Sequence, residues 1–121
     1  MDNKAIVRAF YDEVFNAWDV SRADKYVRED YRQHNPTVED GRAGFVRFCE
    51  RFFRLHPRME IVRMIAEGDF VVVFFKCTVD GGVNKVCDIY RLEDGMLAEH
   101  WDVVEHNVDP EAKGANGNGI F

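Results

Sequence analysis

The segment from Phe70 to Asn107 limits the fold most strongly, because it reads as three long β-strands in succession. Gly81-Gly82 and Asp94-Gly95 are turn sequences that separate runs rich in β-branched and aromatic residues. Strands joined by such short turns pair with their neighbours as an antiparallel meander. About a third of the chain is therefore committed to one sheet.

The last two of these strands carry Asp88, His100 and Asp102 among apolar neighbours. Acids and imidazoles are rare on the buried face of a sheet unless they are hydrogen-bonded or functional. His100 and Asp102 share a face in any register, because side chains alternate with a period of two. Whether Asp88 joins them depends on the turn that connects the two strands.

The hairpin around Asp94-Gly95 allows two registers. A two-residue loop places Asp88 across from Trp101, whereas a three-residue loop with Gly95 in the left-handed region places Asp88 across from His100. A slip of one residue moves every side chain of a strand to the other face. The loop length therefore decides whether the titratable groups meet.

We favour the three-residue loop, because both faces of the hairpin then have a consistent composition. One face is an apolar wall with a small titratable cluster, formed by Val86, Asp88, Tyr90, Leu92, Ala98, His100 and Asp102. The other face is formed by Cys87, Ile89, Arg91, Leu97, Glu99 and Trp101. The first face has the character of a catalytic pocket, and the second is apolar enough to need a cover.

The first half of the chain is dominated by helical periodicity. Apolar residues at spacings of three and four predict amphipathic helices, and prolines mark where the helical pattern stops. The predicted elements are helices over 2–18 and 20–27, an extended piece over 31–35 before Pro36, a helix from 40 or 41 to Pro57, and strands over 59–67 and 70–79. The run over 70–79 is apolar on both faces, which predicts a central strand buried on both sides.

Helices followed by a four-strand meander predict an α+β fold, with helices packed on one face of a curved antiparallel sheet. Such a sheet, closed by helices, forms a cone that encloses an apolar pocket, and its mouth is a natural ligand site. Residues 1–108 are expected to form one domain. Residues 109–121 read as a flexible tail that ends in the apolar pair Ile120-Phe121.

Composition excludes several classes of function. A chain of 121 residues with a net charge of −6 is a poor partner for nucleic acid or anionic membrane. No apolar run approaches the roughly 20 residues of a membrane span, and the charged N-terminus is not a signal peptide. Cys49, Cys77 and Cys87 are an odd number without metal-binding spacing, so reduced thiols in the cytoplasm are expected.

Two motifs, YRQHNPTVEDGRAGFVRFC and VCDIYRLEDGMLAEHWDVVEHN, resemble the SnoaL-like group of the NTF2-like superfamily. The ending NGNGIF resembles the tail of SnoaL-like proteins described as catalysing aldol condensation. The resemblance covers nearly the whole chain. It implies the cystatin-like cone, an apolar cavity and a homodimer formed through the convex face of the sheet.

The resemblance also implies roles for single residues. Asp102 matches the acid/base aspartate of SnoaL-type polyketide cyclases, and Asn35 matches a polar pocket residue there. Against the more distant ketosteroid isomerases, Tyr11 and Asp88 fall on the two groups of the oxyanion hole. Asn35 falls where the isomerases keep their catalytic base.

An asparagine cannot act as that base, so the base must be another group. His34, His100 and Asp102 are the candidates. Each candidate also has a structural interpretation, such as a turn-stabilising histidine or a carboxylate paired within a network. We expect Asp102, His34, Asp88 and His100 to be catalytic, and Tyr11, Asn35, Tyr31 and Tyr90 to bind substrate.

The function expected from these residues is acid/base chemistry on a small apolar carbonyl compound, without cofactor or metal. Aldol-type cyclisation, isomerisation and dehydration all need a base and a group that holds an enolate oxygen. The alternative is a non-catalytic protein of the same fold that binds a small molecule. No HxH, HExxH or CxxC spacing indicates a metal site.

Overall fold

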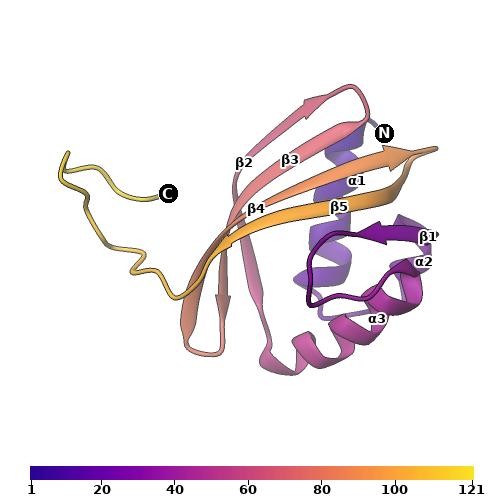
Figure 1. Ribbon diagram of the computed structural model, residues 1–121, viewed down its shortest axis with the longest axis horizontal. Helices are drawn as coiled ribbons and strands as arrows, with labels where there is room; N and C mark the ends of the chain where they lie inside the picture. Colours follow the sequence, from indigo (N-terminus) through magenta and orange to yellow (C-terminus); the bar gives the residue numbers. More distant parts are fainter.

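The structure, a computed structural model, describes all residues 1–121. A single mixed sheet of five strands has the order β1-β5-β4-β3-β2. The strands are β1 (Val27–Gln33), β2 (Arg58–Glu67), β3 (Phe70–Val79), β4 (Gly82–Glu93) and β5 (Met96–Glu105). Figure 1 shows the helices gathered at one side of the curved sheet and the C-terminal tail at the other. The α+β prediction is confirmed, although the sheet is not purely antiparallel.

Three helices close the concave face of the sheet. They are α1 (Asn3–Phe10), which continues as a π-helical turn over Tyr11–Phe15, α2 (Ala23–Tyr26) and α3 (Gly41–Phe52). The side chain of Asp2 caps α1 by accepting from the backbone N–H of Ala5 at 2.8 Å. None of the helices has the length and the apolar run that a bilayer crossing requires.

The π-helical turn interrupts the single long helix that the apolar spacing predicts. It begins at Tyr11, and the N–H of Asn16 donates to the carbonyl of Tyr11 at 2.8 Å, five residues back. Asn16 in turn exchanges two hydrogen bonds with the backbone of Met59 in β2, at 3.0 and 2.7 Å. The turn therefore ties the end of the first helix to the sheet, and such turns are frequent near functional sites.

Strand β1 is a correction to the predicted order of elements. The helix predicted over 20–27 is only the four-residue α2, and the chain then runs parallel to β5, where Gln33 pairs with His100. In β1 only Val27 and Tyr31 are buried, and its register is irregular. The extended piece predicted over 31–35 overlaps the end of β1, but the pattern lacks the period-two alternation that indicates a strand, so its start and its pairing with β5 were not predicted.

The hairpin between β4 and β5 closes with a two-residue loop, so the predicted three-residue loop is wrong. Glu93 pairs with Met96, and both Asp94 (φ 53°) and Gly95 (φ 75°) are left-handed. A type I′ turn has this geometry, and its twist matches that of the flanking strands. Asp-Gly is one of the preferred sequences for it.

A β-bulge in β5 restores the predicted face. Leu92 pairs with Leu97 and Arg91 with Glu99, so Ala98 is the extra residue. Beyond the bulge, Asp88, His100 and Asp102 share the inner face, as predicted. Their pairing differs, because Asp88 lies across from Asp102 and not from His100. Leu97, predicted on the outer face, is fully buried in the core.

Strand β3 is buried on one face only, contrary to the prediction. Val71, Val73, Phe75 and Cys77 point into the core, whereas Val72 and Phe74 are half-buried on the convex side. The turn before β4 is Asp80-Gly81, with φ of 52° and 77°, and not Gly81-Gly82. The helices cover only the concave side, so the second apolar face of β3 has no helix against it.

The convex side of the sheet, called the outer face below, carries a continuous set of partly exposed apolar side chains. Its members are Phe70, Val72, Phe74, Cys87, Ile89, Trp101 and Val103, and Val103 is 69% exposed. The tail reaches this face: the ring of Phe121 stacks on that of Phe74 with centroids 6.0 Å apart. The tail also forms a tight turn of its own, with Lys113 bridged to Gly119.

Candidate active site

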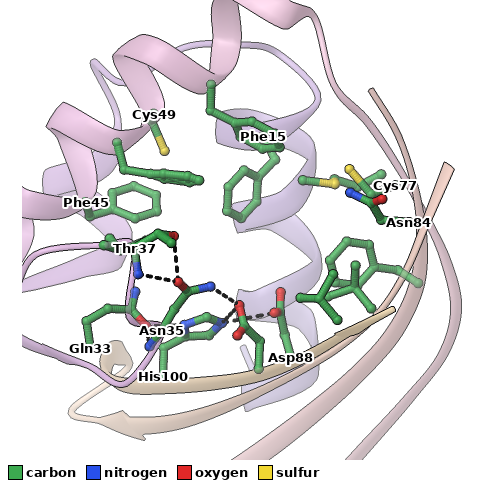
Figure 2. A pocket seen from close by; sticks show the side chains of 18 of the residues that line it. Phe15, Gln33, Asn35, Thr37, Phe45, Cys49, Cys77, Asn84, Asp88 and His100 are labelled. Atoms are coloured by element: carbon green, nitrogen blue, oxygen red, sulfur yellow. Dashed lines mark hydrogen bonds and ion pairs between the residues drawn. The ribbon is translucent and has the colours of Figure 1, made fainter. Parts of the chain in front are cut away.

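A cavity of about 230 Å³ lies between α3 and the inner face of the sheet, and most residues that line it are hydrophobic. Figure 2 shows Phe15, Phe45 and Cys49 on its helical side. Gln33, Asn35, Asp88 and His100 lie together on the opposite side. The polar groups are therefore concentrated at one side of an otherwise apolar space, which is the usual form of a small-molecule site.

Asp88 is buried, and both of its carboxyl oxygens are occupied. Tyr11 and Tyr90 donate their hydroxyl hydrogens to Oδ2, the latter at 3.0 Å. Oδ1 lies 3.0 Å from Nε2 of His100. Burial, and then the charge of Asp88, raise the pKa of Tyr11 and of Tyr90 well above the ordinary value, so both phenols stay protonated donors.

Asp102 is placed differently. Its Oδ2 accepts from Nδ2 of Asn35 at 2.8 Å, while its Oδ1 makes no hydrogen bond within the protein. The amide of Asn35 is fixed by Thr37, whose N–H and hydroxyl both donate to Asn35 Oδ1, at 2.9 and 2.7 Å. Asp102 is thus held at one oxygen, and its other oxygen is free on a residue that lines the cavity.

His100 connects the two carboxylates. Asp88 and Asp102 lie opposite each other on neighbouring strands, an arrangement that is unfavourable for two like charges. The ring of His100 approaches both, with Nε2 at 3.0 Å from Asp88 Oδ1 and 3.9 Å from Asp102 Oδ2. Its other nitrogen, Nδ1, lies 2.6 Å from Oε1 of Gln33. The imidazole is therefore held at both nitrogens.

Tyr31 is the one tyrosine at the cavity whose hydroxyl makes no hydrogen bond within the protein. The hydroxyls of Tyr11 and Tyr90 bond to Asp88 and lie 3.0 Å from each other. Burial, followed by the charge of Asp88, raises the pKa of Tyr31 well above the ordinary value. Tyr31 lines the cavity as a neutral phenol that is free to bond to a ligand.

The structure does not bring His34 into the cavity, contrary to the predicted role of a catalytic group there. The ring of His34 stacks on Trp101 with centroids 4.8 Å apart, and its Nε2 lies 2.7 Å from Oε2 of Glu99. Both partners belong to the opposite face of β5. The bond from His34, and after it the bond from Arg91, lower the pKa of Glu99. His34 is thus part of a surface pair.

Of the other predicted site residues, Asn35, Tyr31 and Tyr90 line the cavity, whereas Tyr11 lies behind Asp88 and reaches it by a hydrogen bond. Gln33 also lines the cavity, although the sequence assigned no role to it. Only its place at the end of β1, beside His100, gives it a contact with the ring. A single glutamine in a loop-like stretch carries no motif that would reveal this.

The cysteines are thiols without a catalytic environment. Burial raises the pKa of Cys77 to about 12 and raises that of Cys49 further, and neither has a cationic neighbour that would favour a thiolate. All three cysteines are free. Nucleophilic catalysis by a thiolate therefore has no support in this pocket.

Asp88, His100 and Asp102 each offer one atom that could bind a metal ion, and these atoms lie within 4.8 Å of one another. Both oxygens of Asp88 and Nε2 of His100 already make hydrogen bonds, so an ion at Nε2 would replace the bond between His100 and Asp88. The arrangement is accounted for as a hydrogen-bond network. The absence of a metal requirement stays a prediction.

The fold is the NTF2-like one. An NTF2-like protein from Cytophaga hutchinsonii matches with a TM-score of 0.74 and 17% identity over 87% of this chain and 91% of that chain. A candidate ketosteroid isomerase from Kribbella flavida matches with a TM-score of 0.77 and 20% identity over 94% and 85%. A SnoaL-like polyketide cyclase from Agrobacterium tumefaciens matches with a TM-score of 0.73 and 15% identity over 87% and 92%.

The sequence itself identifies the family. Residues 7–100 match the model of the SnoaL-like domain, so this chain belongs to the SnoaL-like family. The functionally curated proteins include none that matches the chain. The structural relatives include proteins described as cyclases and isomerases, and at these identities they establish the fold and not the reaction.

Proposed function

We propose that this protein is an enzyme that removes a proton from a carbon next to a carbonyl group, with Asp102 as the base. The observation that carries the proposal is the free Oδ1 of Asp102. Of the two carboxylates that line the cavity, Asp88 has both oxygens occupied, so only Asp102 has an oxygen available to accept a proton.

An enolate formed by this step needs a donor for its oxygen, and the residues that line the cavity offer two. The ring of His100 lies beside Asp102, and the hydroxyl of Tyr31 is unengaged. Donors that are fixed before the reaction stabilise a developing oxyanion strongly in a cavity from which water is excluded. Aldol-type cyclisation, isomerisation and dehydration are all open to this set of groups.

The cavity volume supports a small, mostly apolar substrate. About 230 Å³ is slightly below the range of roughly 300–1,000 Å³ that is typical of drug-sized ligands. The same apolar walls support the second candidate, a protein that binds a small apolar molecule without changing it. The two candidates differ in whether the carboxylate of Asp102 is needed for turnover or only shapes the cavity.

We also propose that the protein is a homodimer formed through the outer face. It includes Trp101 and Val103, and an exposed apolar set of this extent is typical of a protein interface. The three free thiols support the expected cytoplasmic location, where thiols are kept reduced.

The test is turnover of small carbonyl compounds, including polyketide-like ones, by the wild type and by Asp102→Asn. The amide keeps the shape of the carboxylate but cannot act as the base. Turnover should fall by a factor of about 10² to 10⁴, while ligand-induced thermal stabilisation persists. Asp109→Asn removes an exposed carboxylate from the tail and is the matched control.

Unchanged turnover in Asp102→Asn would remove the base assignment. If no carbonyl compound is converted, yet an apolar ligand stabilises the wild type and Asp102→Asn equally, the non-catalytic binder becomes the better account.

A further inference from the structure

The side-chain amide of Gln33 has a fixed orientation. Its Oε1 accepts from the backbone N–H of His34 at 3.1 Å and from that of Asn35 at 3.0 Å. Turning the amide over would place its NH₂ group against these two donors. The atom of Gln33 that faces His100 is therefore the oxygen, which can only accept.

This orientation determines where the ring of His100 carries hydrogen. Nδ1 of His100 lies 2.6 Å from Gln33 Oε1, and a hydrogen bond between them requires the hydrogen on Nδ1. The contact is set by the backbone, because β1 and β5 pair Gln33 with His100, and the N–H of His34 also donates to the carbonyl of His100 at 3.0 Å.

With Nδ1 protonated, the other side of the ring is also constrained. Nε2 lies 3.0 Å from Oδ1 of Asp88, a bond that holds one hydrogen between the two atoms. Oδ2 of Asp88 receives hydrogen bonds from two tyrosines, which stabilise a carboxylate there. Asp102, opposite Asp88, adds a second negative charge near Nε2. All of these groups are satisfied when Nδ1 carries a hydrogen toward Gln33 and one further hydrogen lies between Nε2 and Asp88 Oδ1.

We infer that Gln33 is a positioning residue: its amide oxygen fixes the Nδ1–H form of His100, so that one proton is held between Nε2 and Asp88, next to Asp102. The catalytic consequence rests on the proposed function. His100 then acts as a proton donor and not as the base: its Nε2 hydrogen leaves the bond to Asp88 and moves to the enolate oxygen, while Asp102 takes the proton from carbon. The proton returns to the Asp88–His100 pair when the product oxygen regains its carbonyl form.

The test is the state of the His100 ring, which needs no substrate. Long-range hydrogen–nitrogen correlation NMR of isotope-labelled protein, purified with a chelator, separates protonated from bare ring nitrogens. His100→Gln assigns the signals, and the other three histidines serve as internal references. The wild type should show hydrogen on Nδ1 of His100. A spectrum with a bare Nδ1 and hydrogen only on Nε2 overturns the inference.

Three variants test the role of the glutamine. Gln33→Met keeps the length of the side chain but removes the acceptor, so the Nδ1–H signal of His100 should be lost. Gln33→Glu keeps an acceptor and should retain the signal. Arg32→Met introduces the same side chain at the exposed neighbour in β1 and should change nothing.

A structural role alone would lower the melting temperature of Gln33→Met and leave the protonation pattern of His100 as in the wild type. An Nδ1–H signal of His100 that persists in Gln33→Met therefore overturns the inference. Loss of this signal in Arg32→Met overturns it as well. If Gln33→Met does not fold, the spectra of the wild type and of Gln33→Glu still show whether Nδ1 of His100 carries hydrogen, and a bare Nδ1 overturns the inference. Both results are independent of turnover by Asp102→Asn, so this inference and the proposed function can fail separately.

Discussion

At the scale of single residues, hydrogen-bond partners separate two otherwise similar aspartates. Asp88 and Asp102 share the inner face of one hairpin, yet Asp88 receives three donors and Asp102 only one. The period-two pattern predicts that both face the pocket. It cannot predict the partners Tyr11 and Asn35, because these lie far away in the sequence and meet the strands only in the folded chain.

The tyrosine hydroxyls give a prediction on stability. Tyr11→Phe removes a buried donor to the Asp88 carboxylate and should lower the free energy of unfolding by about 1.5–3 kcal/mol. Tyr31→Phe is the matched control, because its hydroxyl has no partner in the protein and the loss should be below about 1 kcal/mol. Urea denaturation measures both. Equal losses in the two variants would contradict the assigned network.

The variants Tyr11→Phe and Tyr31→Phe should also differ in their affinity for a ligand. Tyr31→Phe should weaken the binding of a carbonyl ligand, because the free hydroxyl lines the cavity. Tyr11 lies behind Asp88, so Tyr11→Phe should leave direct ligand contacts in place. Titration followed by intrinsic fluorescence would show this, and wild-type affinity in Tyr31→Phe would exclude the hydroxyl as a ligand contact.

At the scale of elements, the sequence predicts most of the sheet but not its irregularities. The strands and the Asp94-Gly95 turn follow from alternation and turn chemistry. The bulge at Ala98 has no chemical signature, and β1 lacks alternation, so the pairing of Asp88 and the fifth strand could not be derived. The predicted common face was right because the shorter loop and the bulge compensate each other.

The turn offers a test of this register. Gly95 has a φ of 75°, and alanine at this position adds only an ordinary contact with Ile6 at 3.9 Å. Backbone strain alone should therefore lower the free energy of unfolding by about 1–2 kcal/mol in Gly95→Ala. Gly119→Ala, at a glycine without positive φ, is the control. A Gly95→Ala variant as stable as the wild type would contradict the type I′ turn.

The surface pair of His34 and Glu99 predicts that the stability of the fold depends on pH. The pKa of Glu99 is lowered in the folded state, first by the bond from His34 and then by Arg91. Its contribution to stability is complete above the unfolded pKa of about 4.3 and is lost as the pH falls through the lower folded value. In urea melts the wild type should exceed Glu99→Gln near neutral pH and converge with it in acid. A constant difference would contradict this linkage.

At the scale of the whole molecule, the outer face decides the assembly. Trp101→Arg places a charge within this face and should convert the proposed dimer to a monomer, measured by light scattering at micromolar concentration. A dimer interface of standard size buries about 800 Å² on each subunit. Leu55→Arg changes an exposed apolar residue in the 3₁₀ turn that follows α3, and it should leave the dimer intact. A monomeric wild type would refute the proposal.

The most direct test of the whole account is proton abstraction itself, followed as deuterium uptake by a small ketone in heavy water. NMR of the ketone monitors exchange at the carbon next to the carbonyl and does not require knowledge of the natural product. The wild type should accelerate the exchange, and Asp102→Asn should lose that acceleration by a factor of about 10² to 10⁴. Equal acceleration by both proteins would contradict the assignment of Asp102 as the base.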